Sequence, residues 1–442
     1  MLWFDVTSLL RWNRPPVGII RTELECARSI LAEGDPDVRF CATEQHRLVV
    51  ISHEEVRARI DMSSSQLHAA PPELAVLQGG SARLRAALGS MARGISPVRW
   101  LVRGLRRTAG AARAALVPSR PVGGTTSARA DAALGIGDAY VSAGIDWDDK
   151  DEALLLKLKQ TRAVRITRLC YDLIPVKLPQ LAHPSSRSAK AEGYFVDLAR
   201  SADVVACISE RTRADFIEFL DQTGTPVPRC ETIRLGGELP SGPAGELPAA
   251  LVARPFILYV SSIERRKNHQ VIVNAYARLV EEGHGDILPL LVFVGMWGWG
   301  VKDMATEIGL DPRLAHRILI LGDIDDDTLV SLYRNCRFTV FPSFYEGWGL
   351  GISESLAAGK FCLASNAGAL PEAGGDLVEY IDPLDGLGWS RRLLHYIRDD
   401  DALRAQEARI RSDYTVVGWE TTARRIMALA RQAGDGISPR AS

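Results

Sequence analysis

Apolar residues from about residue 256 onward gather into short runs, and these runs are separated by amphipathic stretches. Within residues 268–282 the apolar positions recur every three or four residues, which predicts a helix with one buried face. Runs that are apolar almost throughout are typical of parallel strands covered on both faces. We therefore expect a parallel sheet flanked by helices, with strands at 256–261, 289–295, 317–322, 338–343 and 361–365.

The preceding part of the chain shows the same alternation less regularly. Residues 237–255 are rich in glycine and proline and lack periodicity, which predicts a linker with a boundary near residue 250. We expect an α/β protein of two doubly wound, Rossmann-like domains that face each other across a cleft, residues 1–250 and 251–442. The expected strands of the first domain are 165–175, 202–209 and 231–237, and its expected helices are 187–201 and 209–220.

Length and composition agree with this architecture, since 442 residues are too many for a single ordinary core. The net charge of −1 gives no indication of a nucleic-acid partner. Seven scattered cysteines without a Cys-x-x-Cys pair argue against a disulfide framework and a structural zinc site. The first residues lack the basic start of a signal peptide, and no run approaches the ~18 apolar residues of a membrane span. We expect a cytoplasmic protein, at most peripheral on the inner face of the cytoplasmic membrane.

Residues 74–130 form an insertion of unusual composition, with ten arginines, no lysine and no acidic residue. Apolar residues between 84 and 105 follow a four-three spacing, and Pro97 would divide a helix there into 81–96 and 98–116. One interpretation is an amphipathic helix that packs on the first domain with its arginines in solvent. The other is a surface, about residues 81–120, that rests on anionic lipid or meets a lipid phosphate.

The stretch FPSFYEGWGLGISESLAAG, residues 341–359, places Glu346 and Glu354 on either side of a glycine-rich turn. We expect it to join the strand 338–343 to a helix over 352–359, with Glu354 in the first helical turn. Ligands bind beyond the carboxyl ends of parallel strands, where the N–H groups of residues 350–353 would meet an anion such as a diphosphate. Each carboxylate would then accept hydrogen bonds from a polyol. The alternative is a plain turn whose carboxylate complements the helix dipole.

Two further loops should lie at the same edge of the sheet. Residues 261–270, SSIERRKNHQ, place the adjacent cations Arg266 and Lys267 after a strand, where they could neutralise a diphosphate. The alternative there is a solvated basic turn. Residues 296–300, MWGWG, could stack on a nucleobase, or could wedge the loop onto its own domain.

Three of these stretches together resemble the retaining glycosyltransferases of family 4, which have the glycosyltransferase-B (GT-B) fold. They are YVSSIERRKNH, FPSFYEGWGLGISESLAAG and ASNAGALPEAGGDLVEYIDPLD. YDLIP (171–175), ISERTRADF (208–216) and VGIIRTELECARSIL (17–31) resemble first-domain stretches of the same family more loosely. The resemblance covers most of the chain except residues 45–135.

The resemblance implies transfer of a hexose from a nucleoside diphosphate sugar with retention at the anomeric carbon. Mannose and GDP-mannose are favoured, while UDP- and dTDP-sugars stay open. The implied acceptor is a lipid-linked saccharide or an oligosaccharide in the synthesis of a surface polysaccharide such as O-antigen, capsule or exopolysaccharide, without a further cofactor. The last helix, about 418–433, is expected to pack back on the first domain.

The same resemblance assigns roles to particular residues. Glu346 would bind hydroxyls of the donor sugar and Glu354 the ribose, while Gly18 would close on the phosphates from the first domain. Asp172 would contact the acceptor hydroxyl or the donor sugar, or it would cap a turn; Tyr171 stands where the family commonly has histidine. The candidate catalytic residues are Asp172, Glu346, Arg266 and Lys267, and the candidate donor-binding residues are Gly18, Ser262, Arg266, Lys267, Glu346, Gly349, Leu350, Gly351 and Glu354.

Asp323, Asp325 and Asp327 alternate as metal-binding aspartates do, but they precede a helix expected near residue 327, and a helix N-cap with acids in the first turn explains them. We therefore expect no metal. The alternatives to a transferase are an epimerase or hydrolase of nucleotide sugars with the same fold, and a catalytically silent partner that binds the nucleotide.

Overall fold

The computed structural model describes residues 1–12, 18–65, 74–75, 129–183, 189–240, 245–314, 316–322 and 324–433. The arginine-rich insertion lies outside the described residues, apart from the two-residue strand β4 (Leu74–Ala75) and residues 129–130. Both interpretations of residues 81–120 therefore stay predictions. Within the described part of the chain, no helix has both the length and the apolarity needed to cross a bilayer.

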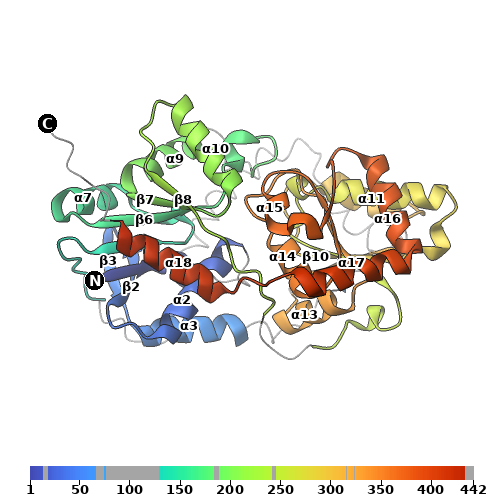
Figure 1. Cartoon of the computed structure of the whole chain (residues 1–442), viewed down its shortest axis with the longest axis horizontal. Coiled ribbons are helices and arrows are strands. Elements are labelled where there is room, and N and C mark those ends of the chain that lie inside the picture. Colours follow the sequence, from blue (N-terminus) through green and yellow to red (C-terminus); the bar gives the residue numbers. More distant parts are fainter. Residues whose placement is uncertain are drawn as a thin grey trace, which may run out of the picture. The chain divides into compact units, whose positions relative to one another are not determined.

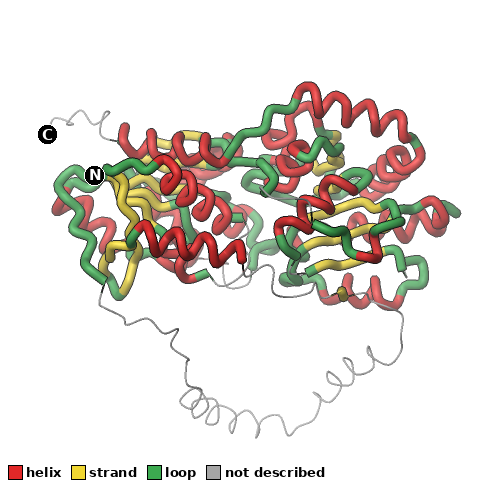
Figure 2. Tube along the Cα trace, turned by 90° about the horizontal axis from the view of Figure 1, so that it is seen from below, coloured by secondary structure: helices red, strands yellow, loops and turns green. Residues whose placement is uncertain are grey.

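Two mixed but mainly parallel sheets form the framework, each with seven strands in the described chain (Figure 2). The first has the order β3-β2-β1-β5-β6-β7-β8, and only β2 and β3 are antiparallel neighbours in it. Its strands are β1 Leu2–Asp5, β2 Val38–Glu44, β3 Arg47–Ile51, β5 Ala139–Ser142, β6 Arg165–Cys170, β7 Val204–Cys207 and β8 Arg229–Thr232.

The second sheet has the order β14-β13-β12-β9-β10-β11-β4, and β4 is its antiparallel edge strand. Its remaining strands are β9 Phe256–Val260, β10 Leu290–Val294, β11 Ile318–Leu321, β12 Thr339–Phe341, β13 Cys362–Ser365 and β14 Glu379–Ile381. All five strands predicted for this half are confirmed, each shorter than predicted by one to three residues. They are buried almost throughout because helices cover both faces of a parallel sheet.

Helices connect the strands in both sheets. In the first half they are α1 Thr7–Arg11, α2 Ile19–Glu33, α3 His53–Ser65, α6 Asp146–Asp149, α7 Glu152–Arg162, α8 Ile174–Lys177, α9 Ala189–Ser201 and α10 Glu210–Gln222. In the second half they are α11 His269–Glu281, α12 Lys302–Leu310, α13 Asp326–Asn335, α14 Leu350–Ala357, α15 Leu370–Gly374, α16 Gly386–Arg398, α17 Asp400–Asp413 and α18 Trp419–Gln432. The helices predicted at 187–201, 209–220 and 268–282 are confirmed as α9, α10 and α11.

Two strand predictions in the first half are partly wrong. The strand predicted at 165–175 ends at Cys170, because the chain turns there into the short helix α8. The strand predicted at 231–237 is the short β8, which ends at Thr232. Beyond it the backbone leaves the sheet, and Gly236 packs so closely on Trp419 that a Cβ would lie 2.5 Å from the indole.

Helix α18 packs on α2 and on strands β5, β6 and β7 of the first sheet (Figure 1). Its buried face includes Ile426, Met427, Leu429 and Ala430, so burial of this apolar stripe holds the helix in place. The two sheets confirm the predicted α/β class of two doubly wound, Rossmann-like units. The domain boundary near residue 250 stays a prediction.

Candidate active site

The candidate site lies where the strand order of the second sheet reverses. Strand β9 has β10 on one side, and the chain continues from β10 to β11 before it returns to place β12 on the other side of β9. Ligands of open α/β sheets bind outside the carboxyl ends of the strands at such a reversal. The loops that follow β9 and β12 carry Arg266, Lys267 and Glu346.

The three loops predicted to share this edge are joined by backbone hydrogen bonds. The N–H of Phe344 donates to the carbonyl oxygen of Arg266 at 2.9 Å. On the other side, the N–H of Gly298 donates to Ile263 at 2.8 Å and that of Arg265 donates to Trp299 at 3.1 Å. The prediction that residues 261–270, residues 296–300 and the turn within residues 341–359 lie at one edge of the sheet is therefore confirmed.

Glu346 forms ion pairs with both cations of the loop after β9. Its carboxylate lies 2.6 Å from Lys267 Nζ and 2.8 Å from a terminal nitrogen of Arg266. Arg266 also pairs with Glu264 at 2.7 Å and donates to the carbonyl oxygen of Tyr345 at 2.9 Å. The side chains of Arg266 and Lys267 are only 14% and 13% exposed, so the alternative of a solvated basic turn is wrong.

A tight turn of the backbone presents these cations. Residues 265–267 form one 3-10 turn, and Asn268 follows in the left-handed conformation at φ 54°. Asparagine tolerates that conformation better than most residues. Its side-chain amide donates to the carbonyl oxygens of Pro342, at 3.1 Å, and Pro383, at 2.9 Å, which ties the turn to the loops after β12 and β14.

Burial and charge pairing act in opposite directions on these groups. Burial disfavours the ionised carboxylate of Glu346, but Arg266 and Lys267 outweigh it and lower its pKa to about 2. For Lys267, burial outweighs the attraction of Glu346, so the pKa of its ammonium group is lowered. The pKa of Arg266 is raised, because Glu346 and Glu264 overcome the effect of its burial. Arg266 is therefore the permanent cation of the cluster.

The amino end of α14 offers fewer free N–H groups than predicted. The helix begins at Leu350, and its N-cap Gly349 has φ 135°, a conformation that side chains rarely adopt. The carbonyl oxygen of Gly349 accepts from the N–H of Ile352 at 3.0 Å and from that of Ser353 at 3.3 Å. Of the N–H groups of residues 350–353, those of Leu350 and Gly351 have no acceptor among the described residues, so the predicted anion site narrows to these two.

Glu354 was predicted to lie in the first turn of this helix. That prediction is wrong, because α14 begins two residues earlier than expected. The hydroxyl of Tyr333 on α13 donates to its carboxylate at 2.7 Å. Burial raises the pKa of Glu354, while the hydrogen bond from Tyr333 and the charge of Arg21 oppose that rise. Tyr333 and Arg21 were both missed by sequence reasoning, and the only signal for Arg21 was its place three residues after Gly18.

Arg21 also lines a cavity of about 820 Å³ between α2, residues 238–240 and the amino ends of α13 and α18. It forms an ion pair with Asp326 on α13 at 2.8 Å. The cavity is lined mainly by charged side chains, among them Glu25, Glu238 and Asp327. None of the predicted site residues lines it, so we assign the site from the ion pairs and the sheet edge rather than from this cavity.

Asp172 caps a turn, which was one of the two interpretations of this residue. Its carboxylate accepts from the N–H of Ile174 at 3.0 Å. Burial raises its pKa against the opposing charge of Arg266. Tyr171, beside it, donates its hydroxyl to the carbonyl oxygen of Ala143 at 2.5 Å in the interior of the first sheet. Contact between Asp172 and an acceptor stays a prediction.

Gly18 and Ser262 are two predicted site residues outside the hydrogen bonds described so far. Gly18 is exposed at φ 52° and is the N-cap residue of α2, and helix α1 lies between strand β1 and Gly18 along the chain. Ser262 is exposed, and its carbonyl oxygen accepts from the hydroxyl of Ser261 at 3.3 Å. Neither residue has a described hydrogen bond to Glu346, Arg266 or Lys267.

The two tryptophans after β10 differ in their surroundings. Trp299 donates its indole N–H to the carbonyl oxygen of Leu181 at 3.3 Å, and its ring meets His183 edge-on with centroids 5.1 Å apart. This contact favours neither of the two roles weighed for the loop, because Leu181 lies after β6 of the first sheet. Trp297 is 44% exposed, and its stacking on a base stays a prediction.

The aspartates before α13 cap that helix, as predicted. Asp325 accepts from the N–H of Thr328 at 2.7 Å, and Asp326 and Asp327 lie in the first turn. Asp323 falls outside the described residues. Among the residues whose positions are given, no group of three or more histidine, cysteine, aspartate or glutamate side chains is arranged to hold a metal ion.

Comparison with known proteins agrees with this geometry. Residues 249–406 match the family model "Glycosyl transferases group 1". The chain is 29% identical over 266 residues to the O-antigen chain mannosyltransferase B of Escherichia coli, across 59% of this chain and 68% of the relative. It is 27% identical to the serotype-specific mannosyltransferase WbdA of Escherichia coli, across 58% of this chain but only 32% of the relative.

A solved structure, the sucrose-phosphate synthase of Thermosynechococcus elongatus, shares the fold with a TM-score of 0.51 and 20% identity, across 67% of this chain and 74% of that one. Both sheets, the paired Glu346 and the matched region lead to one assignment. The chain is similar to glycosyltransferases of family 4, two mannosyltransferases among them, and it has the GT-B fold.

Proposed function

We propose that this glycosyltransferase moves a hexose, with mannose favoured, from a nucleoside diphosphate sugar to a lipid-linked saccharide or an oligosaccharide, with retention at the anomeric carbon. GDP-mannose is the favoured donor. The observation that carries the proposal is the pairing of Glu346 with Arg266 and Lys267 where the strand order reverses. The likeness to two mannosyltransferases, one of them named for the O-antigen chain, supports mannose and surface polysaccharide synthesis.

Binding of the donor would replace ion pairs within this cluster by contacts with the diphosphate and the sugar. Arg266 and Lys267 are matched by the carboxylates of Glu264 and Glu346 in the protein alone. A diphosphate at the N–H groups of Leu350 and Gly351 would attract the two cations, and Glu346 would then be free to accept hydrogen bonds from sugar hydroxyls. Glu354, with Tyr333 beside it, would hold the ribose.

The electrostatics also bear on how the proton of the acceptor is removed. A carboxylate whose pKa is about 2 is a weak base near neutral pH, so Glu346 is poorly suited to general-base catalysis. We therefore name no protein nucleophile or base, and we propose that the departing phosphate takes the proton of the acceptor hydroxyl on the face where attack occurs. Arg266, Lys267 and the amino end of α14 would stabilise the charge that builds up on the diphosphate.

The domain arrangement follows from the proposed reaction. We propose that residues 1–250 carry the acceptor side and residues 251–442 bind the nucleotide sugar, with α18 returning to the first domain. An acceptor that is linked to lipid would bring the protein to the inner face of the cytoplasmic membrane.

The decisive experiment is a thermal-shift panel with GDP, UDP, dTDP and ADP, followed by incubation of the selected nucleotide sugar with lipid-linked acceptors. Ligand at about a hundredfold excess over Kd should stabilise the protein by roughly 2.7 kcal/mol. NMR of the product should show the anomeric configuration of the donor. The variant Lys267→Met should lose the shift, whereas Lys302→Met, an exposed lysine on α12, should keep it.

Each rival activity has its own outcome in this experiment. Release of free sugar or of an epimer without acceptor would indicate a hydrolase or an epimerase. A nucleotide shift without turnover would indicate a silent binding partner. If the folded protein shifts with none of the nucleotides, the proposed donor site is wrong.

A further inference from the structure

The first two turns of α10 contact both residues that flank Glu346. The hydroxyl of Tyr345 accepts from Arg211 Nε at 2.9 Å and donates to the carboxylate of Asp215. On the other side, the hydroxyl of Thr212 donates to the carbonyl oxygen of Gly347 at 3.3 Å. Glu346 therefore lies between two points that are fixed to one helix, although α10 follows a strand of the first sheet.

Asp215 is the centre of this contact. Its side chain is 1% exposed, and its carboxylate also forms ion pairs with Arg211 and Lys177, each at 2.6 Å. A buried carboxylate with three donors has little freedom to move, because each lost hydrogen bond would leave its buried charge less well compensated. The guanidinium of Arg211 also lies 6.0 Å from the centre of the Tyr345 ring, within the range of a cation–π contact. Tyr345 is therefore held through its hydroxyl and its ring.

The helix itself is fastened at the same end. Glu372 on α15 accepts from the N–H groups of Glu210 at 2.7 Å and Arg211 at 2.8 Å, which are the first two residues of α10. A carboxylate at the amino end of a helix is stabilised by the helix dipole. Tyr345 donates to Asp215 of this helix, and Thr212 of the same helix donates to Gly347. Both hydrogen bonds are therefore made with a helix whose amino end is held in place.

We infer that Tyr345 is a positioning residue for Glu346, and that its hydroxyl acts through Asp215 on α10. The inference rests on the proposed function, in which Glu346 holds the donor sugar. The backbone carbonyl oxygen of Tyr345 accepts from Arg266 at 2.9 Å, and Tyr345→Phe leaves that contact in place. The Tyr345 hydroxyl itself has no described contact with Arg266, with Lys267 or with the amino end of α14, where the diphosphate is proposed to bind. Loss of the hydroxyl should therefore lower the rate of transfer much more than it lowers the affinity for the nucleotide.

The test compares Tyr345→Phe with a matched control, Tyr396→Phe. Tyr396 on α16 also donates its hydroxyl to a carboxylate, Glu379 at 2.7 Å, and it also lies beside an arginine, Arg392. Tyr345→Phe should lower kcat about tenfold, because small displacements of a reacting group cost large factors in rate. The Kd of the nucleoside diphosphate, from titration calorimetry, should change by less than about twofold. Tyr396→Phe should change neither.

A second comparison separates positioning from general loss of structure. Adding Tyr345→Phe to Glu346→Gln should cost no further activity, because residues that act as a unit are not additive. Arg211→Gln, which removes a donor to Tyr345 from the solvent side, should repeat the effect of Tyr345→Phe on kcat. An active enzyme with unchanged kcat in Tyr345→Phe, or with equal losses in kcat and nucleotide affinity, would overturn the inference.

A measurement that needs no catalysis tests the inference even if the native protein turns over no donor. Glu346 covers Lys267 Nζ at 2.6 Å, so a displaced Glu346 should let acetic anhydride reach that amine faster. Peptide mass spectrometry should show faster acetylation of Lys267 in Tyr345→Phe but not in Tyr396→Phe, with Lys360 as the internal reference. Absence of turnover in the native protein would count against the proposed function alone, and an unchanged acetylation rate of Lys267 would overturn the positioning role.

Discussion

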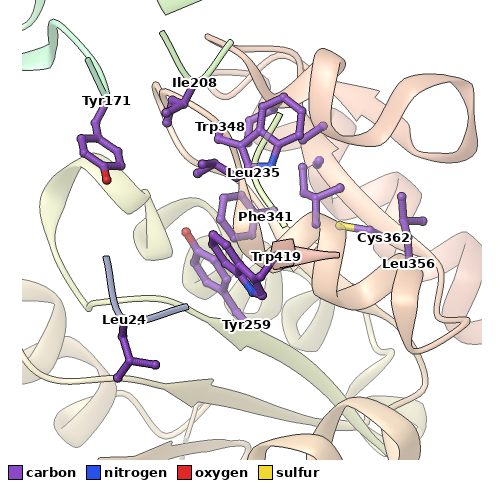
Figure 3. Packing of buried hydrophobic residues seen from close by; sticks show 14 of the residues in the cluster. Leu24, Tyr171, Ile208, Leu235, Tyr259, Phe341, Trp348, Leu356, Cys362 and Trp419 are labelled. Atoms are coloured by element: carbon purple, nitrogen blue, oxygen red, sulfur yellow. The ribbon is translucent and has the colours of Figure 1, made fainter. Parts of the chain in front are cut away.

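The α-carbon of Gly347 packs against the carbonyl oxygen of Tyr171 so closely that a Cβ on Gly347 would lie 1.9 Å from that oxygen. The next residue, Trp348, belongs to the same buried hydrophobic cluster as Ile208 and Leu235 (Figure 3). The guanidinium of Arg234 lies 5.7 Å from the centre of the Trp348 ring. The loop that carries Glu346 is therefore fitted against residues that follow β6, β7 and β8 of the first sheet.

Gly347→Ala should consequently damage both stability and transfer. The new methyl group has no space beside a backbone oxygen, so we expect the free energy of unfolding to fall by roughly 1–3 kcal/mol, as in other overpacked sites. Urea unfolding would measure this loss. Gly309→Ala is the control, because a Cβ there meets nothing within 4 Å, and alanine should stabilise α12 by up to about 1 kcal/mol. Equal stability of the two variants would contradict the expectation.

Glu346→Gln should separate nucleotide affinity from transfer. The change removes the carboxylate that competes with a diphosphate for Arg266 and Lys267, so the Kd of the nucleoside diphosphate should stay the same or fall. Transfer should drop about a hundredfold, since the sugar loses its charged acceptor. Calorimetry and initial rates would measure the two effects, with Glu307→Gln on α12 as the control. Wild-type transfer by Glu346→Gln would exclude its proposed role.

Tyr333→Phe should make nucleotide binding more sensitive to acid. Burial already raises the pKa of Glu354, and loss of the hydrogen bond from Tyr333 should raise it further. Protonated Glu354 accepts hydrogen bonds from a ribose less strongly, so affinity should fall as the pH falls, and the fall should begin at a higher pH in the variant. Calorimetric Kd values between about pH 5 and 8 would show this.

The control for that experiment is Tyr276→Phe. Tyr276 lies on α11, and its hydroxyl donates to the carbonyl oxygen of Pro289 at 3.4 Å. The pH dependence of nucleotide affinity in Tyr276→Phe should match that of the native protein. Identical profiles for Tyr333→Phe and Tyr276→Phe would mean that Glu354 does not govern binding.

Glu23 should make the native protein less stable as the pH rises. It is fully buried on α2, and burial raises its pKa to about 8, helped by the charges of Asp5 and Asp146 and opposed by Lys150. The folded state therefore holds a proton that the unfolded chain, with its ordinary pKa of 4.5, has already released. The stability is fully present below pH 4.5 and declines up to about pH 8, by at most ~1.4 kcal/mol per pH unit.

Glu23→Gln should remove this dependence, since the amide does not titrate. The gain in stability of the variant over the native protein should therefore grow between about pH 5 and 8, as followed by urea unfolding. Glu307→Gln should run parallel to the native protein over the same range. A constant difference between Glu23→Gln and the native protein would mean that Glu23 is ionised throughout.

Strands β9 to β13 of the second sheet could be predicted because they are almost wholly apolar, whereas β14 of that sheet and several strands of the first could not. Strand β1 ends in Asp5, which is buried because Lys150 pairs with it and Tyr140 donates to it at 2.7 Å. Those partners lie more than a hundred residues away, so local hydrophobicity gives no sign of them. Strand β14 has only three residues, two of them polar or partly exposed.

The loops that form the candidate site could be predicted, but the contacts between their side chains could not. Parallel strands bring their carboxyl ends to one edge, which places Lys267 near Glu346 across 79 positions. The direct ion pair depends on loop conformation, including left-handed Asn268, which no periodicity reveals. The start of α14 was misplaced because Leu350 and Gly351, which were expected in the loop, are the first two residues of the helix.

Helix α18 makes the order of synthesis matter for this chain. The ribosome completes all strands of the first sheet by residue 232, yet the helix that packs on α2 and β5–β7 follows only after the second sheet has been made. Until then, the apolar surface that Ile426 and Leu429 will cover is exposed and can cause aggregation. A fragment cut near residue 250 would keep that open surface permanently, so expression of the first half should require residues 419–432 supplied alongside it.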